Sequence, residues 1–287
     1  MVYIDQLLWP QGKKKAFTLS YDDGVTQDLQ LIDLFGQYGV KATFNLNPGL
    51  FGDRAQADIG GRTVRYDRLT AQEIPVQYAG QDIAAHGWHH VFPDDKDSGR
   101  YCREILKSRE ALEDLLGHPV IGYAYPYGQA GFRIRESVRM CGIGYARTTV
   151  STHAFTLPED FLEWNPTCHH NDNDLSDLAD RFLSDDFFFA DPPVRLMYVW
   201  GHSFEFDING NWDRIEQLLR KVSGKADVWY ASNTDIYRYV TAWRRLEFSL
   251  DSRYVYNPTD QTIWLGSSMS RKIVHVPPGT VMEITNQ

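Results

Sequence analysis

The sequence predicts an α/β fold, a distorted (β/α) barrel of about seven strands, followed by a small all-β appendage. Strand-like and helix-like segments alternate from about residue 14 to about residue 244, as they do in successive βαβ units. About seven such repeats can be counted, which is near the number for a closed or distorted barrel. The 287 residues suffice for a barrel of about 250 residues and a small addition.

Each predicted strand or helix is assigned from a pattern in its own stretch of sequence. The apolar run 16–20 reads as a strand that stops at Tyr21-Asp22-Asp23-Gly24. The helix expected over 26–38 has an apolar face, and Gly39 is placed as its C-cap. Residues 50–80 are polar and contain glycine, so we expect a long loop with a helix starting near Thr70. The remaining predicted strands are 41–46, 81–85, 120–125, 144–147, 194–200 and 227–230, and the remaining predicted helices are 99–116, 133–140, 174–183, 212–222 and 233–243.

The pattern changes after Arg245, where short strand-like segments are separated by turn signals such as Asn257-Pro258. The expected strands are 246–250, 254–256, 263–265, 272–276 and 281–284. We therefore predict a catalytic barrel over 1–245 and a β appendage over 246–287. The appendage could bind carbohydrate, cover the open end of the barrel or form a dimer contact, and a structural role is the favoured interpretation.

Composition excludes several classes of partner. Lys and Arg number 29 against 38 Asp and Glu, a net charge of −9, which argues against nucleic acid as a partner. No run of about 18 apolar residues occurs, so no membrane partner is expected. The N-terminus lacks the features of a signal peptide, so we expect a cytoplasmic protein unless a leader has been removed. The sequence leaves open whether the chain forms a homo-oligomer.

The cysteines predict neither a disulfide framework nor a zinc site. There are three of them, Cys102, Cys141 and Cys168, and they are widely separated along the chain. We expect them to be reduced structural thiols.

Two segments predict a metal site at the carboxyl ends of strands, where barrels carry their active sites. Asp22 and Asp23 stand where one strand stops; the alternative interpretation is a turn with a helix N-cap. His86 and His90 are four residues apart, so on a helical turn they share one face and can bind one ion. Packing or surface histidines are the alternative, and His89 between them should point away.

Two further strand ends carry residues suited to acyl transfer. In Tyr125-Pro126-Tyr127-Gly128, a rigid turn could direct the backbone N–H of Tyr127 at a developing oxyanion, although an ordinary Pro-Gly turn has the same sequence. Trp200-Gly201-His202-Ser203 places His202 at the end of the clearest buried strand. A lone histidine is more often structural, but this one falls on the same rim as the other motifs.

In this order, the four segments resemble the motifs of the polysaccharide deacetylases, the NodB-homology domain proteins of carbohydrate esterase family four. That family's pattern is a T-F-D-D-G-like segment, then H-S/T-x-x-H, R-x-P-Y/F, D-x-x-D-W and L-x-H. The resemblance covers about residues 14–240 and implies a distorted (β/α) barrel.

The resemblance also implies roles for individual residues. Asp22 would be the general base, His202 the general acid, and the Tyr127 backbone part of an oxyanion hole. One carboxylate and two imidazoles form a mixed site that leaves positions open for water and substrate. Zn²⁺ is the expected ion, with Co²⁺, Ni²⁺ or Mn²⁺ as alternatives. The implied metal ligands are Asp23, His86 and His90.

The chain departs from the family pattern in ways that affect the site. Gly87 replaces the usual Ser or Thr, and Ala124 stands where the third motif has the Arg that orients the base. Arg147, which ends the following strand, could supply that charge. The fourth motif is only approximated by residues 160–164. Cys168-His169-His170 resembles a metal pair, but adjacent residues cannot share a helical face, so we predict a structural or peripheral role.

Together these observations predict a metal-dependent hydrolase that removes acetyl groups from a carbohydrate, with N-acetyl favoured over O-acetyl. The expected partner is an acetylated saccharide, contacted by Tyr127, Trp164 and Trp200. Two alternatives stand: a hydrolase of a non-peptide C–N bond in a small amide, and a non-catalytic carbohydrate-binding protein that keeps the metal site.

Overall fold

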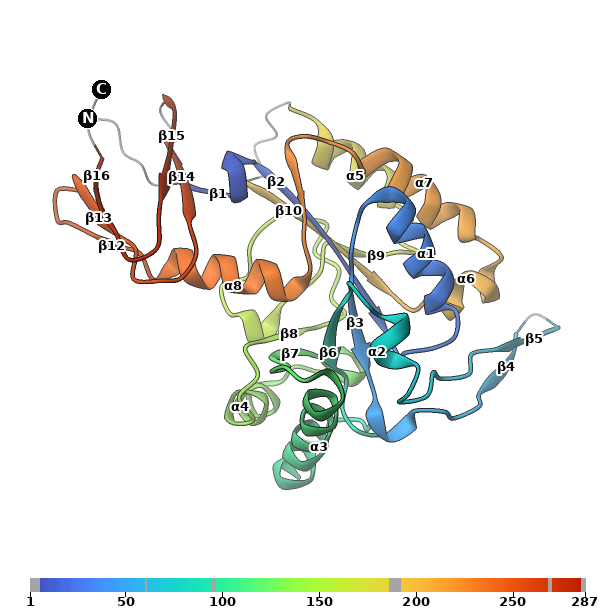
Figure 1. Ribbon diagram of the computed structural model, residues 1–287. Coiled ribbons are helices and arrows are strands. Elements are labelled where there is room, and N and C mark those ends of the chain that lie inside the picture. Colours follow the sequence, from blue (N-terminus) through green and yellow to red (C-terminus); the bar gives the residue numbers. More distant parts are fainter. Residues whose placement is uncertain (1–5, 60, 94–96, 186–191, 268–269, 285–287) are drawn as a thin grey trace.

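A computed structural model describes residues 6–59, 61–93, 97–185, 192–267 and 270–284 and is organised around one curled sheet (Figure 1). The strand order is β8-β7-β6-β3-β2-β10-β9, and β11 also pairs with β2. All pairings in this sheet are parallel, which confirms the predicted α/β class and distorted barrel. The strands are β2 (Lys15–Asp22), β3 (Thr43–Leu46), β6 (Asp82–Ala85), β7 (Gly122–Ala124), β8 (Tyr145–Arg147), β9 (Cys168–His169), β10 (Arg195–Gly201) and β11 (Val228–Tyr230).

The barrel is closed by an irregular segment rather than by a continuous pair of strands. The Trp164 N–H donates to Ala146 O of β8 at 3.0 Å, and Thr148 N–H donates to Trp164 O at 3.0 Å. A few residues later, Thr167 N–H donates to Tyr198 O of β10 at 2.8 Å, and β9 continues that pairing. One short stretch therefore bonds to both edges of the sheet, which accounts for the distortion of the barrel.

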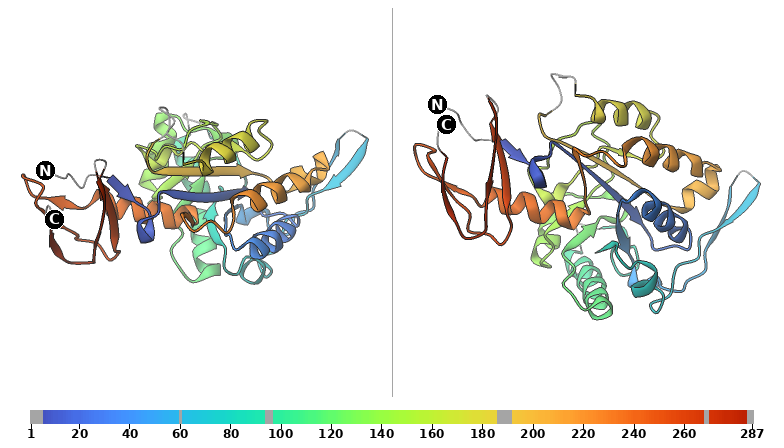
Figure 2. Two further views of the ribbon diagram at one scale, coloured as in Figure 1. Left: turned by 90° about the horizontal axis from the view of Figure 1, so that it is seen from above. Right: turned by 45° about the horizontal axis from the view of Figure 1, so that its top comes forward.

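Helices cover the outside of the curled sheet (Figure 2). α1 ends at Gly39, whose left-handed φ of 65° makes it the predicted C-cap. No helix in the described ranges is long and apolar enough to cross a membrane. The helices are α1 (Asp28–Tyr38), α2 (Ile74–Gln77), α3 (Ser98–Leu116), α4 (Phe132–Met140), α5 (Leu175–Leu183), α6 (Phe204–Asn209), α7 (Trp212–Val222) and α8 (Asn233–Arg244).

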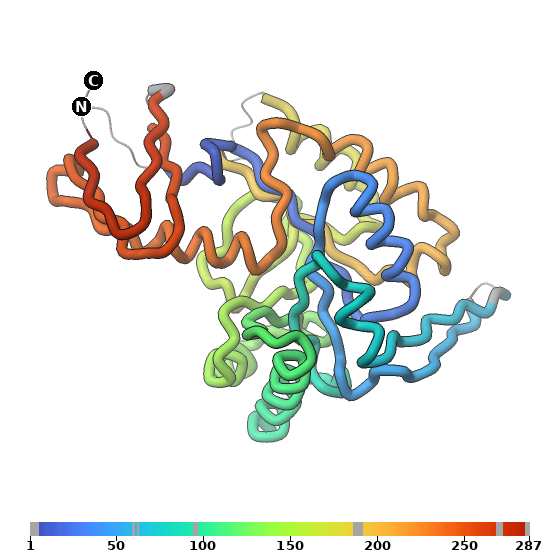
Figure 3. Tube along the Cα trace, viewed as in Figure 1, coloured from blue at the N-terminus to red at the C-terminus, as the bar shows by residue number. Residues whose placement is uncertain are grey.

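The expectation of a long loop over residues 50–80 is wrong for the central part of that range. β4 (Gln56–Ile59) and β5 (Arg62–Arg65) pair antiparallel as a hairpin that projects from the barrel, as the trace in Figure 3 shows. The sequence contains the corresponding signal, a Gly-Gly pair at 60–61 between two short runs. The polar composition of the strands concealed it, because Val64 is the one buried residue among the described side chains of the two strands.

The C-terminal residues form two small three-stranded sheets at the opposite end of the molecule from that hairpin (Figure 3). The N-terminal strand β1 (Gln6–Leu8) pairs with β14, so the second sheet joins both halves of the sequence. The Tyr239 hydroxyl on α8 donates to Leu8 O at 2.7 Å and accepts from Trp264 N–H at 3.0 Å. The division of the chain at residue 245 stays a prediction. The appendage strands are β12 (Glu247–Phe248), β13 (Tyr254–Tyr256), β14 (Ile263–Ser267), β15 (Ser270–Val276) and β16 (Val281–Glu283).

Candidate active site

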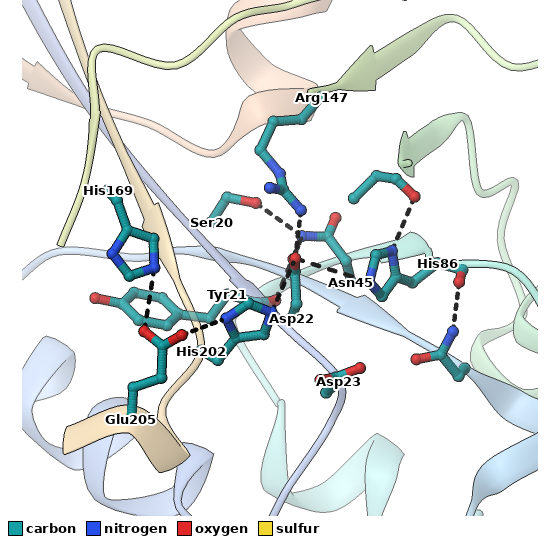
Figure 4. A network of polar contacts seen from close by, with 12 residues as sticks. Ser20, Tyr21, Asp22, Asp23, Asn45, His86, Arg147, His169, His202 and Glu205 are labelled. Carbon is teal, nitrogen blue, oxygen red and sulfur yellow. Dashed lines mark hydrogen bonds and ion pairs between the residues drawn. The ribbon is translucent and has the colours of Figure 1, made fainter. Parts of the chain in front are cut away.

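The two adjacent aspartates point to different places because the chain turns between them. β2 is buried along its whole length and ends at Asp22. Asp23 adopts a left-handed backbone with φ of 85°, and Gly24 follows with φ of 67°. A Cβ on Gly24 would lie 2.9 Å from Leu46, so the turn has little room for a side chain there. Asp22 therefore lies within the polar network in Figure 4, and Asp23 lies beside it.

Asp23, His86 and His90 come together as a group that can hold a cation. One ligand atom from each lies within 4.8 Å of the other two. The His86 Nδ1–H donates to Ala124 O at 2.8 Å, which leaves Nε2 as a free acceptor. Among the described residues, His86 Nε2 is buried without a hydrogen-bond partner, and Asp23 Oδ1 makes no hydrogen bond of normal geometry but has Arg68 Nη1 as an ion-pair partner at 3.2 Å. Such atoms are costly to bury unless a cation satisfies them, so the residues fit a divalent ion.

The protonation states of these three side chains also suit a cation. Burial alone would raise the pKa of Asp23, but the Arg68 guanidinium 3.2 Å away, with the nearby imidazoles, lowers it to about 2. Burial lowers the pKa of His86 to about 4 and lowers that of His90 as well. At neutral pH the carboxylate is therefore ionised and both imidazoles are neutral, as metal ligands must be.

Asp22 is held by two donors, one from the neighbouring strand β3 and one from β8 across the barrel. Asn45 Nδ2 donates to Oδ1 at 2.7 Å, and Arg147 Nη2 donates to Oδ2 at 2.5 Å. The Nε2 atoms of His86 and His202 lie 3.7 and 3.8 Å from the same Oδ2. Burial disfavours the charged carboxylate, but Arg147 and the two imidazoles outweigh it, so the pKa of Asp22 lies below its ordinary value. The structure thus brings Arg147 to Asp22, the contact that the sequence suggested.

His202 has a carboxylate partner that the sequence analysis did not find. Its Nδ1 lies 3.0 Å from Oε1 of Glu205, which begins the first turn of α6. Burial would lower the pKa of His202, but the Glu205 hydrogen bond and the charges of Asp22 and Asp23 raise it to about 9. His202 is therefore a cation at neutral pH, with Nε2 turned toward Asp22 (Figure 4). The sequence signal that could have indicated this pair is the spacing of three residues between His202 and Glu205.

The turn carrying Tyr127 is fixed by its glycine. Tyr127 has a φ of 58°, and a Cβ on Gly128 would lie 2.0 Å from the Thr149 hydroxyl oxygen. Asp23, His90 and Tyr127 are three of the six non-glycine residues with left-handed φ in the described chain. Strained backbone conformations of this kind are more frequent at functional sites than elsewhere in proteins. The Tyr127 ring is 57% exposed and packs against His90 with ring centroids 4.7 Å apart.

The two tryptophans expected to contact substrate are buried. Trp164 is 1% exposed and packs between Phe161 and Tyr198, because its backbone forms the closing bridge of the barrel. Trp200 is 7% exposed, and the Arg147 guanidinium lies 4.4 Å from its ring centroid. Trp164 therefore belongs to the core, whereas Trp200 supports the side chains that surround Asp22.

Comparison with known proteins agrees with this fold. Residues 10–146 match the family model described as polysaccharide deacetylase. Over that segment, which is a little less than half of the chain, the sequence is similar to the polysaccharide deacetylases. The segment contains Asp22, Asp23, His86, His90 and Tyr127, while Arg147, His202 and Glu205 lie beyond it.

Several solved structures are similar to this chain at low sequence identity, and the first of them shares its fold. A candidate polysaccharide deacetylase from Mycobacterium smegmatis has a TM-score of 0.54 at 18% identity, over 85% of this chain and 96% of that one. The family 4 carbohydrate esterase from Streptomyces lividans, in complex with acetate, has a TM-score of 0.47 at 15% identity, over 76% and 93%. The Xyl-CE4 domain of a xylanase from the Trinervitermes trinervoides hindgut metagenome has a TM-score of 0.48 at 15% identity, over 80% and 92%. No curated protein matches the chain.

We predict that His202 titrates near pH 9 and that Glu205→Gln moves this titration down by at least one pH unit. Removing the carboxylate removes the partner that favours the charged imidazole, so the proton is lost at lower pH. Side-chain ¹⁵N NMR of the metal-free protein measures both values. His118→Ala, at an exposed ring far along the sequence, is the control. A His202 titration unchanged in Glu205→Gln would contradict this assignment.

Proposed function

We propose that the protein is a metal-dependent hydrolase that removes acetyl groups from a saccharide, N-acetyl groups before O-acetyl groups. One observation carries the proposal. Three side chains that can bind a cation, those of Asp23, His86 and His90, lie beside an ionised carboxylate and a protonated imidazole. The carboxylate is that of Asp22, and the imidazole is that of His202. A binding protein has no need for a paired base and acid. Among divalent ions, a donor set of one carboxylate and two imidazoles suits Zn²⁺ first, with Co²⁺, Ni²⁺ and Mn²⁺ as alternatives.

The side chains divide the reaction between them. An ion held by the three ligands would supply Lewis acidity, which polarises a carbonyl group and acidifies water. Asp22, kept ionised by Arg147 and Asn45, accepts the proton of the attacking water. The Tyr127 backbone N–H is assigned to the developing oxyanion. His202 donates its Nε2 proton to the departing nitrogen or oxygen, and Glu205 holds the ring in the required orientation.

The charge of His202 favours an amide substrate over an ester. An amine leaves readily only after its nitrogen has been protonated, so cleavage of an N-acetyl group depends strongly on a general acid. With a pKa of about 9, His202 holds its proton throughout the neutral range. This supports the preference for N-acetyl groups.

Exposed aromatic rings beside the metal ligands favour a saccharide over a small amide. Phe92 is 62% exposed and Tyr127 is 57% exposed, and their ring centroids lie 5.5 Å apart. Large exposed apolar surfaces next to a reactive centre are typical of ligand-binding sites. Phe92 also lines a cavity of about 710 Å³ with Val91, Pro93, Asp97, Arg100, Tyr101, Gln129, Gly131 and Ile134. A sugar ring stacked on the two aromatic rings would extend into that cavity.

We predict that Asp22→Asn lowers acetate release from N-acetylated glucosamine oligosaccharides by about 10²- to 10⁴-fold while the protein keeps its zinc. His86→Ala should lose both activity and the zinc bound at Asp23 and His90, because two ligands hold an ion weakly. Free acetate and bound zinc are measured on the same samples. His89→Ala, whose ring is exposed and contacts Glu104, is the matched control. Full activity in Asp22→Asn would show that another group is the base.

Arg147→Ala should move the acid limb of the profile of kcat/KM against pH to higher pH. Without the guanidinium, burial dominates and the pKa of Asp22 rises, so the base is protonated over more of the acidic range. Since Arg147 is buried, Arg147→Lys is measured beside it and should retain part of the shift toward low pH. An identical pH profile in folded Arg147→Ala would rule out the assigned role.

Phe92→Ala should raise KM for a tetrasaccharide about fivefold with little change in kcat, because stacking on a sugar ring contributes about 1 kcal/mol. For an N-acetylated monosaccharide or a small aliphatic amide, the KM should change much less. Phe248→Ala, an exposed ring on the appendage, serves as the control. Equal KM values for wild type and Phe92→Ala on the tetrasaccharide would exclude the stacking surface.

A further inference from the structure

A second group of potential metal ligands lies beside the candidate active site. His169 ends β9, His202 follows β10, and Glu205 lies in α6, yet one donor atom from each falls within 4.8 Å of the other two. Figure 4 shows the Glu205 carboxylate between the rings of His169 and His202. Three separate chain segments therefore meet at one carboxylate.

The distances within this group suit coordination of one ion. His169 Nε2 lies 3.1 Å from Glu205 Oε2, and His202 Nδ1 lies 3.0 Å from Glu205 Oε1. In a tetrahedral site with bonds of about 2.0 Å, neighbouring ligand atoms are separated by about 3.3 Å. The two contacts to Glu205 are therefore close to the spacing of neighbouring ligands of one ion.

His170 supplies an independent observation. Its side chain is fully buried, and its Nε2 lies 3.0 Å from Glu205 Oε2. Despite that distance, neither ring nitrogen makes a hydrogen bond of normal geometry to any described residue. Burial lowers the pKa of His170 to about 4, so the ring is a neutral potential ligand. A buried imidazole aimed at a carboxylate without a hydrogen bond is the kind of group that a cation would satisfy.

We propose that His169, His202 and Glu205, beside the buried ring of His170, form a second site for a divalent cation of the Zn²⁺ class. Imidazole nitrogens and one carboxylate oxygen are ligands that zinc accepts in tetrahedral geometry. The Trp200 ring packs against His169 and His202, with centroids 4.7 and 5.6 Å away, and limits how far the two rings can move apart.

An ion at the second site would oppose the proposed function, on which this part of the inference rests. His202 Nδ1 would bind the ion in place of its hydrogen bond to Glu205, and Glu205 would no longer stabilise the protonated ring. His202 would then be a much weaker acid, because giving up its Nε2 proton would leave an imidazolate bound to the ion rather than a neutral imidazole. The first ion is therefore an activator and the second an inhibitor, so activity falls once zinc exceeds one equivalent.

The test counts zinc ions bound to the purified full-length chain by calorimetric titration with zinc chloride and by elemental analysis. We expect two ions in the wild type, one in His86→Ala, one in His169→Ala, and none in the double variant. His118→Ala, at an exposed ring outside both groups, should keep two. His169→Gln is measured alongside in case the alanine variant does not fold.

Titration with Co²⁺ provides a second measurement, because the second site should give the absorption bands of a four-coordinate ion in His86→Ala and lose them in the double variant.

Inhibition by the second ion is measured as the rate of acetate release at ten equivalents of zinc divided by the rate at one equivalent. This ratio should be below 0.1 in wild type and near one in His169→Ala. One ion in wild type and none in His86→Ala would overturn the second site. Two ions with no acetate released would instead refute the proposed function and leave the second site standing.

Discussion

The ionised carboxylate of Asp22 is the constraint to which the rest of the site responds. It is 2% exposed, and a buried charge is costly unless donors and opposite charges surround it. Asn45, Arg147, His86 and His202 come from four different strand ends to surround it. Because all strands run parallel, their carboxyl ends meet on one rim, and only this topology brings the four partners together.

The ion pair between Asp22 and Arg147 also connects the chemistry to the distortion of the barrel. Arg147 is the last residue of β8, and its backbone bridges to Trp164 in the irregular closing segment. Its guanidinium packs on Trp200 of β10 while it contacts Asp22 of β2. One residue therefore links three parts of the barrel wall. A change in the closing segment would alter the position of the arginine and hence the proton affinity of Asp22.

Local signals in the sequence predicted most of the fold and the first half of the site. Apolar runs, helical periodicity and Gly39 placed the strands and helices of the barrel closely. The spacing of His86 and His90 indicated one site, and Arg147 was identified because it ends the strand next to Ala124. Glu205 was missed because a glutamate in the first turn of a helix has an ordinary local explanation. Trp164 was misplaced because residue type alone does not distinguish a core indole from one that faces a ligand.

Pairings between distant segments were the least predictable feature, and one of them affects how the protein is made. β1 pairs with β14, whose residues are about 255 positions later in the chain. Leu7 and Leu8, buried in the finished protein, therefore have no strand partner while the ribosome is still synthesising the barrel. The barrel can begin to form without them, but the first strand must wait for nearly the whole chain. Synthesis of β14, rather than that of the barrel, therefore sets the earliest moment at which β1 can pair and its apolar residues can leave water.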